Sequence, residues 1–524
     1  MSPDPHTPRR LALQAALDRA RTDRERNIAG QFATPWPLAR AVVRAGLDAL
    51  PPGAPVRFLD PAFGLGAFYD ALRAETGDRP IERATAFEAD PHFAGPAAEL
   101  WADTPLRLQA ADFTRAAPPT APTPLANLVV CNPPYSRHHH LSPADKARLQ
   151  AAGEAATGRR LSGLAGLHAH FLLVSRAWMA PGGAGVWLLP AEFLDVGYGA
   201  ALRSFLTDDV ELLHLHRFDP ADLQFADALV TSAVVVFRAP GAEAPPPTPI
   251  ISVGGALDAP RHAAAVPRAA LRSRAKWSGL PAPAPAPSTG PVIGDRFTVR
   301  RGVATGGNAF FVRPRSVWAQ LGVDEAYLQP VLPPPRRLPG LDIPADPSGL
   351  PALPDPPMLL RTHAPLAQLD REAPALAALL RAAEPTVGQG YLCSRRDPWY
   401  RQEARPAAPL VCTYMGRAKG EARPFRVLRN RSRAIATNNV LLLSPRPEAW
   451  PGGGPTDAQL DAVWRWLNTV PVDTLTAAGR VYGGGLHKLE PRELMAVPLP
   501  PIGPAHEPAA GASEPTPDPR TVAR

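Results

Sequence analysis

The sequence predicts an α/β protein in which a doubly wound, mostly parallel sheet is followed by a separate α+β domain. Short apolar segments typical of buried strands alternate with helical segments over the first part of the chain, as expected for a parallel sheet covered on both faces. Two tracts rich in proline and alanine, 239–249 and 280–291, follow this part. Beyond them the composition is globular again without the alternation, which favours a domain of a different class.

Length and composition indicate a large protein that needs no disulfide. The 524 residues suffice for more than one core, and 45% apolar and 20% charged residues are ordinary values. Cysteine occurs only at positions 131, 393 and 412, and the N-terminus lacks the apolar core of a signal peptide. No apolar run approaches the ~20 residues that cross a bilayer. We therefore expect a cytoplasmic protein without a membrane contact.

The elements of the sheet are predicted in chain order. Residues 1–29 are rich in alanine, leucine and arginine and favour an exposed helical extension. A second helix is expected over 38–50, where it ends before Pro51-Pro52, and a buried strand over 56–60. Further strands are expected at 84–88, 106–110, 127–131, 184–189, 212–216 and 230–237.

A glycine-containing turn, Asp60-Pro61-Ala62-Phe63-Gly64-Leu65-Gly66, follows the strand at 56–60. Glycine at the carboxyl edge of a parallel strand lets the backbone approach a ligand closely. The dinucleotide fingerprint of dehydrogenases requires a third glycine where Tyr69 stands, so that class is disfavoured. Glu88 follows Gly66 by 22 residues at the next strand end, where it can accept hydrogen bonds from a ribose diol or simply face solvent.

The tetrapeptide Asn132-Pro133-Pro134-Tyr135 comes directly after the strand at 127–131. An exocyclic amine on a heteroaromatic ring is a poor nucleophile because its lone pair is delocalised. The Asn132 side-chain oxygen and the Pro133 carbonyl can accept its hydrogens, and the prolines hold these acceptors rigid. Tyr135 offers a face for stacking a base. The alternative is a proline-stiffened turn with an aromatic plug.

Three segments taken together resemble a known family. Residues 30–35 (Gly-Gln-Phe-Ala-Thr-Pro), 60–68 and 132–135 are similar, in this order, to motifs X, I and IV of the γ-class, TaqI-like N6-adenine DNA methyltransferases. The resemblance implies a Rossmann-like catalytic domain that uses S-adenosyl-L-methionine, followed by a DNA-recognition domain. The expected divisions are a helical extension (1–29), the catalytic domain (30–240), a Pro/Ala-rich connector (241–291), the target-recognition domain (292–504) and a disordered tail (505–524).

The resemblance also implies double-stranded DNA as the substrate. Residues 301–308 and 482–491 are similar to segments of recognition domains in this class. The tetrapeptide also occurs in methyltransferases that act on RNA or on protein glutamine, so an RNA or protein amide methyltransferase is the first alternative. A catalytically inactive DNA-binding protein is the second. About 27 residues precede the first motif, so any cognate restriction endonuclease is expected on a separate chain.

Residue roles follow from the same resemblance. Asn132, Pro133, Pro134 and Tyr135 would be catalytic, and Phe225 would stack on the flipped base opposite Tyr135. The nearby Phe218 and Phe237 keep the alignment of Phe225 open. The residues expected to bind the methyl donor are Thr34, Pro35, Asp60, Ala62, Gly64, Gly66, Glu88, Asp112 and Phe113. For Asp112 and Phe113, a surface carboxylate and a core ring are the alternative.

The positive charge of the chain lies in its second half. Residues 1–240 carry a net charge of −2 and residues 241–524 a net charge of +10. The stretch 395–433 holds eleven basic and three acidic side chains, interleaved with Trp399, Tyr400, Tyr414 and Phe425, which favours phosphate contacts with aromatic wedging of the duplex. The expected DNA-binding residues are Arg395, Arg396, Arg417, Arg423, Arg426, Arg429 and Arg431.

The predicted chemistry is direct methyl transfer without a metal ion. Adenine N6 is paired inside a duplex, so the nucleotide must leave the stack before it reacts. An activated methyl group then needs only proximity and amine polarisation. His138-His139-His140 follows the tetrapeptide, but adjacent histidines on a regular element cannot all face one ion, so phosphate contact or plain exposure is expected.

Overall fold

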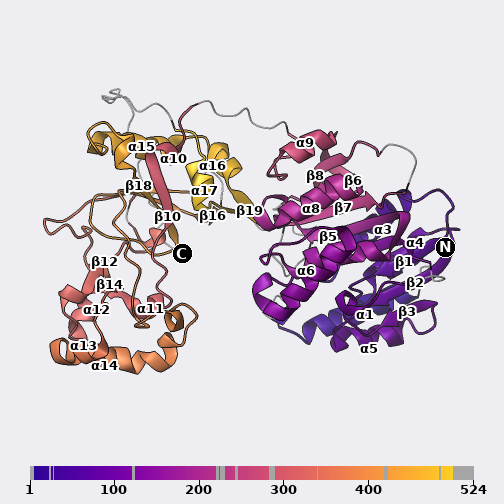
Figure 1. Ribbon diagram of the computed structural model, residues 1–524, viewed down its shortest axis with the longest axis horizontal. Helices are drawn as coiled ribbons and strands as arrows, with labels where there is room; N and C mark the ends of the chain where they lie inside the picture. Colours follow the sequence, from indigo (N-terminus) through magenta and orange to yellow (C-terminus); the bar gives the residue numbers. More distant parts are fainter. Residues whose placement is uncertain are drawn as a thin grey trace. The chain divides into compact units, whose positions relative to one another are not determined.

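The computed structural model describes residues 5–499, apart from 23–24, 27–28, 121–123, 220–223, 225–230, 242–245, 283–289, 339, 418–422 and 483–484. The chain divides into two compact units (Figure 1). The first contains residues 1–285 and 481–485, and the second contains residues 286–480 and 486–524. Within the described residues, no helix is both long and apolar enough to cross a membrane.

The first unit is built on a nine-stranded sheet with the order β3-β2-β1-β4-β5-β7-β6-β8-β9. Its strands are β1 (Val56–Asp60), β2 (Ile81–Phe87), β3 (Leu106–Gln109), β4 (Ala126–Cys131), β5 (Met179–Pro190), β6 (Glu211–Arg217), β7 (Ser232–Arg238), β8 (Ile250–Ala256) and β9 (Ala259–Ala265). Strands β1 to β5 run parallel to one another, and β7 lies antiparallel between β5 and β6. The chain therefore has the predicted mostly parallel sheet, and the α/β class is confirmed.

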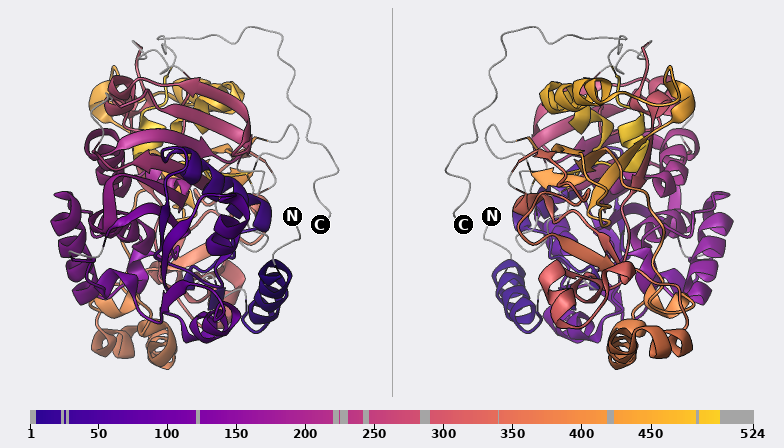
Figure 2. Two further views of the ribbon diagram at one scale, coloured as in Figure 1. Left: turned by 90° about the vertical axis from the view of Figure 1, so that its right-hand side faces the viewer. Right: turned by 90° about the vertical axis from the view of Figure 1, so that its left-hand side faces the viewer.

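Helices cover both faces of this sheet (Figures 1 and 2). The α-helices of its described residues include α1 (His6–Arg19), α3 (Trp36–Asp48), α4 (Ala67–Glu75), α5 (Pro91–Leu100), α6 (Pro143–Thr157), α7 (Leu167–Ser175), α8 (Ala200–Ser204) and α9 (Arg268–Ser273). Buried side chains of α3, α4 and α5 form one core; those of α7 and α8 help to form the other, and α6 packs against it through the partly buried Ala152. The order of the strands reverses beside β1, so β1 and β4 flank the point at which ligands bind in such sheets.

The segment predicted as a connector, 241–291, is largely part of the first unit. Strand β8 pairs parallel with β6, β9 pairs antiparallel with β8, and α9 follows. Ile251, Leu271 and Trp277 from this segment are buried in the core. The prediction was wrong because its boundaries were taken from the two proline-rich tracts. A few well-spaced apolar residues between the tracts suffice to extend the sheet. Strand β9 is the last strand of the sheet, and its side chains are mostly exposed.

Helix α1 is docked on the unit through polar side chains. The Arg10 guanidinium Nε lies 2.6 Å from Asp70 Oδ2 in α4, and the Thr7 hydroxyl donates to Asp70 Oδ1 at 2.7 Å. The His6 ring stacks on Trp101 at a centroid distance of 4.9 Å. Much of this helix is exposed, as expected, but its two buried residues are the polar His6 and Arg10, which apolar periodicity does not reveal. The tail expected at 505–524 lies outside the described residues.

The second unit is a mixed α+β structure, as predicted from the loss of βα alternation. A five-stranded sheet has the order β10-β18-β15-β17-β13, and a three-stranded sheet has the order β11-β14-β12. A further pairing within this unit joins β16 and β20. Its strands are β10 (Phe297–Arg301), β11 (Val312–Pro314), β12 (Leu328–Pro330), β13 (Asp342–Ile343), β14 (Pro357–Leu360), β15 (Leu410–Thr413), β16 (Met415–Arg417), β17 (Val427–Asn430), β18 (Val440–Pro445) and β20 (Leu486–Lys488); β19 (Arg480–Tyr482) spans the division between the units.

Helices of the second unit pack on these sheets around three apolar clusters. They are α10 (Ile293–Arg296), α11 (Asn308–Phe311), α12 (Arg315–Gln320), α13 (Leu366–Glu372), α14 (Pro374–Ala383), α15 (Asp457–Thr469), α16 (Val472–Ala478) and α17 (Pro491–Met495). Thr456 caps α15 by accepting a hydrogen bond from the Gln459 amide, while the Gln459 side chain accepts from the Thr456 amide. This helix packs on β17 and carries two carboxylates, Asp457 and Asp461.

Candidate active site

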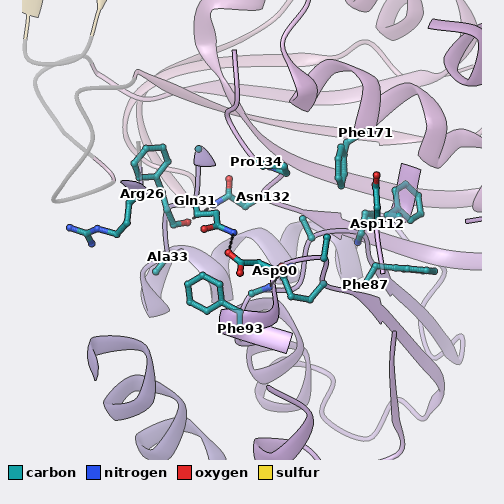
Figure 3. A pocket seen from close by; sticks show the side chains of 18 of the residues that line it. Arg26, Gln31, Ala33, Phe87, Asp90, Phe93, Asp112, Asn132, Pro134 and Phe171 are labelled. Atoms are coloured by element: carbon teal, nitrogen blue, oxygen red, sulfur yellow. Dashed lines mark hydrogen bonds between the residues drawn. The ribbon is translucent and has the colours of Figure 1, made fainter. Parts of the chain in front are cut away.

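A cavity of about 470 Å³ lies at the carboxyl ends of β1, β2 and β4 in the first unit. In Figure 3, Asn132 and Pro134 lie near the middle of the cavity. One end of the cavity is lined by Arg26, Gln31 and Ala33, and the other end by Phe87, Asp112 and Phe171. The predicted site residues that line it are Ala62, Gly64, Glu88, Asp112, Phe113, Asn132 and Pro134. The structure therefore brings the turn after β1 and the tetrapeptide after β4 to one cavity.

The two glycines of the turn after β1 have different surroundings. Both have a positive φ, 55° at Gly64 and 82° at Gly66, so other residues would be strained at either position. A Cβ on Gly64 would meet nothing, and this residue lines the cavity. A Cβ on Gly66 would collide with the Phe63 ring, and Gly66 begins α4. Gly64 thus leaves room for a ligand, whereas Gly66 is required by packing.

Asp60 ends β1 as a buried carboxyl group that is 1% exposed. Its Oδ1 accepts a hydrogen bond from the Ala62 amide at 3.1 Å, and its Oδ2 has no partner among the described residues. Burial raises the pKa of Asp60 to about 8, with a small contribution from the negative charge of Glu88. Asp60 is not part of the cavity wall, and its described hydrogen bond is to the backbone of the turn.

Glu88 holds the turn in place from the end of β2. Its Oε2 accepts a hydrogen bond from the Gly64 amide at 2.7 Å, and its Oε1 accepts one from the Asp90 amide at 2.8 Å. Burial raises the pKa of Glu88 despite these hydrogen bonds. The carboxylate also lines the cavity, so it combines a structural role with a surface that a ligand can reach.

Aromatic rings form the end of the cavity beside Asp112. The Phe113 ring lies 5.3 Å from Phe87 and 5.8 Å from Phe171, measured between centroids. Asp112 Oδ1 accepts hydrogen bonds from the Thr114 amide and hydroxyl, and its Oδ2 is 3.3 Å from the Arg115 guanidinium. Sequence reasoning missed Phe171, because an apolar residue in the helical segment 167–175 gives no sign that it faces a ligand.

The Asn132 side chain has one end held and the other end without a partner. Its Nδ2 donates to the Phe32 carbonyl at 3.0 Å and to the Thr34 hydroxyl at 3.1 Å. Its Oδ1 is buried and has no hydrogen-bond partner among the described residues. Asn132 thus lines the cavity and keeps an acceptor that no described residue uses, as the tetrapeptide chemistry requires.

The other residues of the tetrapeptide are more enclosed than expected. Pro133 is buried, and Tyr135 is 8% exposed with its hydroxyl donating to the Leu188 carbonyl at 3.3 Å. Burial raises the pKa of Tyr135. Its ring lies 5.8 Å from Phe32 and 6.3 Å from His168, between centroids. Phe225, the predicted partner of Tyr135 in stacking, lies outside the described residues.

The segment 30–35 joins the tetrapeptide to the end of β2. The Gly30 carbonyl accepts a hydrogen bond from the Tyr135 amide at 2.8 Å, and Gln31 Nε2 donates to Asp90 Oδ2 at 2.9 Å. Arg21 donates to both Asp90 oxygens at 2.6 and 3.0 Å. Although burial opposes ionisation, hydrogen bonds from Arg21, Gln31 and the His92 amide lower the pKa of Asp90 to about 2. Thr34 and Pro35 do not line the cavity.

Helix α1 and the residues after it complete the wall near Gln31. Gln14, Asp18 and Arg26 line the cavity, and Gln14 Nε2 donates to Asp18 Oδ1 at 2.9 Å. Sequence reasoning placed these residues in an extension without a role. Polar side chains in a helix of low apolar content do not indicate a binding role. Only the docking of Arg10 on Asp70 brings α1 to the site.

Three of the predicted DNA-binding arginines are engaged within the second unit. Arg429 is 2% exposed and donates to Asp457 at 2.6 Å and Asp461 at 2.8 Å, both on α15. Arg431 pairs with Asp342 at 2.9 Å and with Asp461 at 3.1 Å. Arg396 donates to the carbonyls of residues 304 and 305 at 2.6 and 2.7 Å. Arg429 is thus a structural residue, and the prediction that it contacts DNA was wrong.

The other four arginines are more open. Arg395 is exposed and lies 3.9 Å from the centroid of the exposed Tyr391 ring. Arg417 and Arg426 are exposed, and Arg423 is half-buried with a hydrogen bond to the Val470 carbonyl. Trp399, Tyr400 and Phe425 are buried in apolar clusters. Their interpretation as wedges was wrong because aromatic residues interleaved with arginine here form cores beneath a charged surface.

The three histidines after the tetrapeptide form a short 3₁₀ helix, His138–His140, in which none is buried. No group of three or more histidine, cysteine or carboxylate side chains suitable for a metal ion occurs among the residues that the structure describes.

Known proteins match either part or most of the chain. Type II methyltransferase M.AccI of Acinetobacter calcoaceticus is 28% identical over 212 residues, which cover 39% of this chain and 36% of the relative. The solved structure of the type IIL restriction-modification enzyme MmeI in complex with DNA shares 11% identity and a TM-score of 0.48, over 90% of this chain and 70% of that one. The type IIG restriction endonuclease BpuSI shares 16% identity and a TM-score of 0.44 over 92% and 60%.

Two sequence matches include the second unit. Residues 288–513 match the family described as Type II methyltransferase M.Eco57I, C-terminal domain. Type II methyltransferase M.XamI of Xanthomonas campestris pv. amaranthicola is 29% identical over 492 residues, which cover 91% of this chain and 86% of the relative. The chain is thus similar to type II methyltransferases over most of its length, which agrees with the predicted resemblance to DNA methyltransferases.

Proposed function

We propose that this chain is a site-specific DNA adenine-N6 methyltransferase, the modification component of a restriction-modification system. It transfers a methyl group from S-adenosyl-L-methionine to an adenine that is flipped out of duplex DNA. The observation that carries the proposal is the unpartnered Oδ1 of Asn132 at the wall of a cavity bounded by the turn after β1. The similarity to type II methyltransferases over most of the chain supports it.

The cavity has the features that S-adenosyl-L-methionine requires. Gly64 leaves open space beside the backbone, Glu88 offers a carboxylate to ribose hydroxyls, and Phe113 with Phe171 offers apolar rings to the adenine. Asp112 stands beside these rings, where it can accept from an adenine amine. A ligand with a sulfonium and an ammonium group also suits a wall that holds Asp18, Glu88 and Asp90. Bound there, the donor supplies a methyl group already activated for transfer.

The residues of this chain act on the acceptor amine. Asn132 Oδ1 and the Pro133 carbonyl accept its two hydrogens, which favours the pyramidal form with a localised lone pair. Because Asn132 is fixed through its Nδ2 and the following prolines fix the backbone, these acceptors do not reorganise during transfer. After transfer the amine carries an extra proton, which it loses to solvent. Unstacking the base costs on the order of a few kcal/mol, which contacts in the pocket offset.

The decisive experiment follows a labelled methyl group from donor to acceptor. Purified chain is incubated with tritiated S-adenosyl-L-methionine and duplex DNA, RNA or total protein, and labelled DNA is digested to nucleosides. Label in N6-methyl-2′-deoxyadenosine from DNA is expected. Label in N4-methylcytosine would overturn the choice of base, and label confined to RNA or protein would support the amide or RNA alternative. Duplex binding without label in any acceptor would indicate an inactive DNA-binding protein.

A separate endonuclease, where present, should recognise the same DNA sequence. Sequencing modified bases in the DNA of cells that express the chain would give this sequence. Cleavage of unmodified but not modified DNA by the separate protein would establish the pairing.

A further inference from the structure

We infer that Thr34 is a positioning residue: its hydroxyl holds the Asn132 amide in the orientation that the Phe32 carbonyl, which can only accept, selects. The inference rests on the proposed function, because it concerns how the candidate catalytic acceptor is aimed. A carboxamide has one donating and one accepting end of nearly the same shape, so packing alone does not distinguish its two orientations. Only hydrogen-bond partners do.

The partners of Asn132 favour one orientation. The Phe32 carbonyl can only accept, and it lies 3.0 Å from Nδ2. The Thr34 hydroxyl lies 3.1 Å from the same nitrogen and accepts its second hydrogen. Rotating the amide by half a turn would bring two carbonyl oxygens together and leave the NH₂ group toward the reacting amine, where a donor is of no use. The observed orientation leaves Oδ1 as the free acceptor.

The segment 30–35 is held firmly enough to serve this purpose. Gly30 has a φ of 69°, and a Cβ there would come within 2.5 Å of the Tyr135 and Ser136 backbone, so the segment lies directly against the tetrapeptide. The Gly30 carbonyl accepts a hydrogen bond from the Tyr135 amide. The Gln31 side chain donates to Asp90 and accepts from the Arg21 guanidinium at 2.7 Å. At the other end, Pro35 leads into α3. The segment is therefore fixed on both sides of Phe32 and Thr34.

This assignment changes the role expected for Thr34. The family resemblance implied that Thr34 lies against the methionine end of the donor. In the structure it is 8% exposed, is not part of the cavity wall, and has its hydroxyl against Asn132. Its contribution to the reaction is thus made through Asn132, and the two assignments predict different kinetics.

The test removes the hydroxyl and keeps the shape. In Thr34→Val, the single-turnover methylation rate should fall roughly 10- to 100-fold, as expected when a catalytic group loses its fixed orientation. The dissociation constants of S-adenosyl-L-methionine and duplex DNA should stay within about twofold. Thr34→Ser should restore most of the rate because it keeps the oxygen. In an Asn132→Ala background, Thr34→Val should have no further effect, because a residue that acts through Asn132 has nothing left to orient.

A matched control separates positioning from packing. Thr207 is also buried, at 3% exposure, and its hydroxyl donates to the Arg203 carbonyl at 3.0 Å in the same unit, outside the cavity wall. Thr207→Val should leave the methylation rate unchanged, even if it lowers the melting temperature as much as Thr34→Val does, or more. If Thr34→Val is too unstable to assay, the rate and melting temperature of Thr34→Ser and Thr34→Ala are compared, and only a loss of rate in Thr34→Ala supports the inference.

The outcomes distinguish this inference from the proposed function. The acceptor that the wild-type chain labels decides the proposed function. The ratio of the Thr34→Val rate to the wild-type rate, measured on that same acceptor, decides the inference. A wild-type rate in Thr34→Val, or a weaker donor affinity with an unchanged rate at saturating donor, would overturn it.

Discussion

Arg10 of α1 and Asp70 of α4 form an ion pair in which both side chains are buried. The Arg10 Nε lies 2.6 Å from Asp70 Oδ2, with side-chain exposures of 2% and 0%. Since α1 carries Gln14 and Asp18 to the cavity, this pair links the stability of the first unit to the shape of the candidate donor site.

Replacing Arg10 should therefore weaken both stability and donor binding. Removing one partner of a buried pair leaves an uncompensated charge and typically costs about 3–5 kcal/mol. We expect Arg10→Met to lower the unfolding free energy by roughly this amount in urea titrations, and to weaken S-adenosyl-L-methionine binding measured by calorimetry. Arg9→Met, at an exposed position of the same helix, should change neither. Wild-type donor affinity in Arg10→Met would contradict a role of α1 in the site.

Asp60 should make the first unit less stable as the pH rises. Its pKa is about 8 in the folded chain against an ordinary value of 3.8, so between these values the folded state binds a proton that the unfolded state has released. The stability that this proton contributes is complete below about pH 4 and is lost as the pH rises through 8. The melting temperature of Asp60→Asn should rise relative to that of the wild type as the pH increases from 5 to 8. The exposed control Asp48→Asn should track the wild type, and parallel curves for Asp60→Asn would refute the assignment.

Asn132→Ala should abolish most of the methyl transfer and leave binding intact. One preorganised hydrogen-bonding group typically contributes about 10²–10³-fold to the rate. Donor and duplex dissociation constants should stay close to those of the wild type, because the rest of the cavity wall is untouched. A variant that loses donor affinity in proportion to its rate would show that Asn132 serves binding instead.

The arginines of the second unit should separate into two groups. Arg429→Ala should destabilise the unit, because it leaves Asp461 without its buried partner, and should not change the salt dependence of DNA affinity. The double variant Arg417→Ala/Arg426→Ala should bind DNA more weakly, and its affinity should depend less steeply on salt, by roughly one slope unit for each phosphate that the protein no longer neutralises. Equal slopes for the double variant and the wild type would place these two positions outside the DNA interface.

The strands around the site could be predicted because each is a short apolar run that ends in a turn. The expected strand at 127–131 is observed as Ala126–Cys131, and the tetrapeptide follows it as predicted. The partners of polar residues could not be predicted in this way. Arg429 lies in a basic stretch and has the features of a surface residue until the fold brings Asp457 and Asp461 from α15 beside it.

The orientation of Asn132 was likewise beyond the sequence. The motif supplies an amide oxygen at the right place along the chain, but which end of the amide points inward depends on Phe32 and Thr34, about 100 residues earlier. Docking of α1 depends on Arg10 and Asp70, 60 residues apart, which no periodicity reveals.

Strand β9 forms one edge of the large sheet, and its residues suit an edge position. Pro260 has no amide hydrogen to offer, and Arg261 and His262 beside it are exposed. Prolines and charged side chains at such a margin discourage another chain from adding a strand. The nine-stranded sheet can thus carry two extra strands beyond β6 without inviting aggregation of the protein.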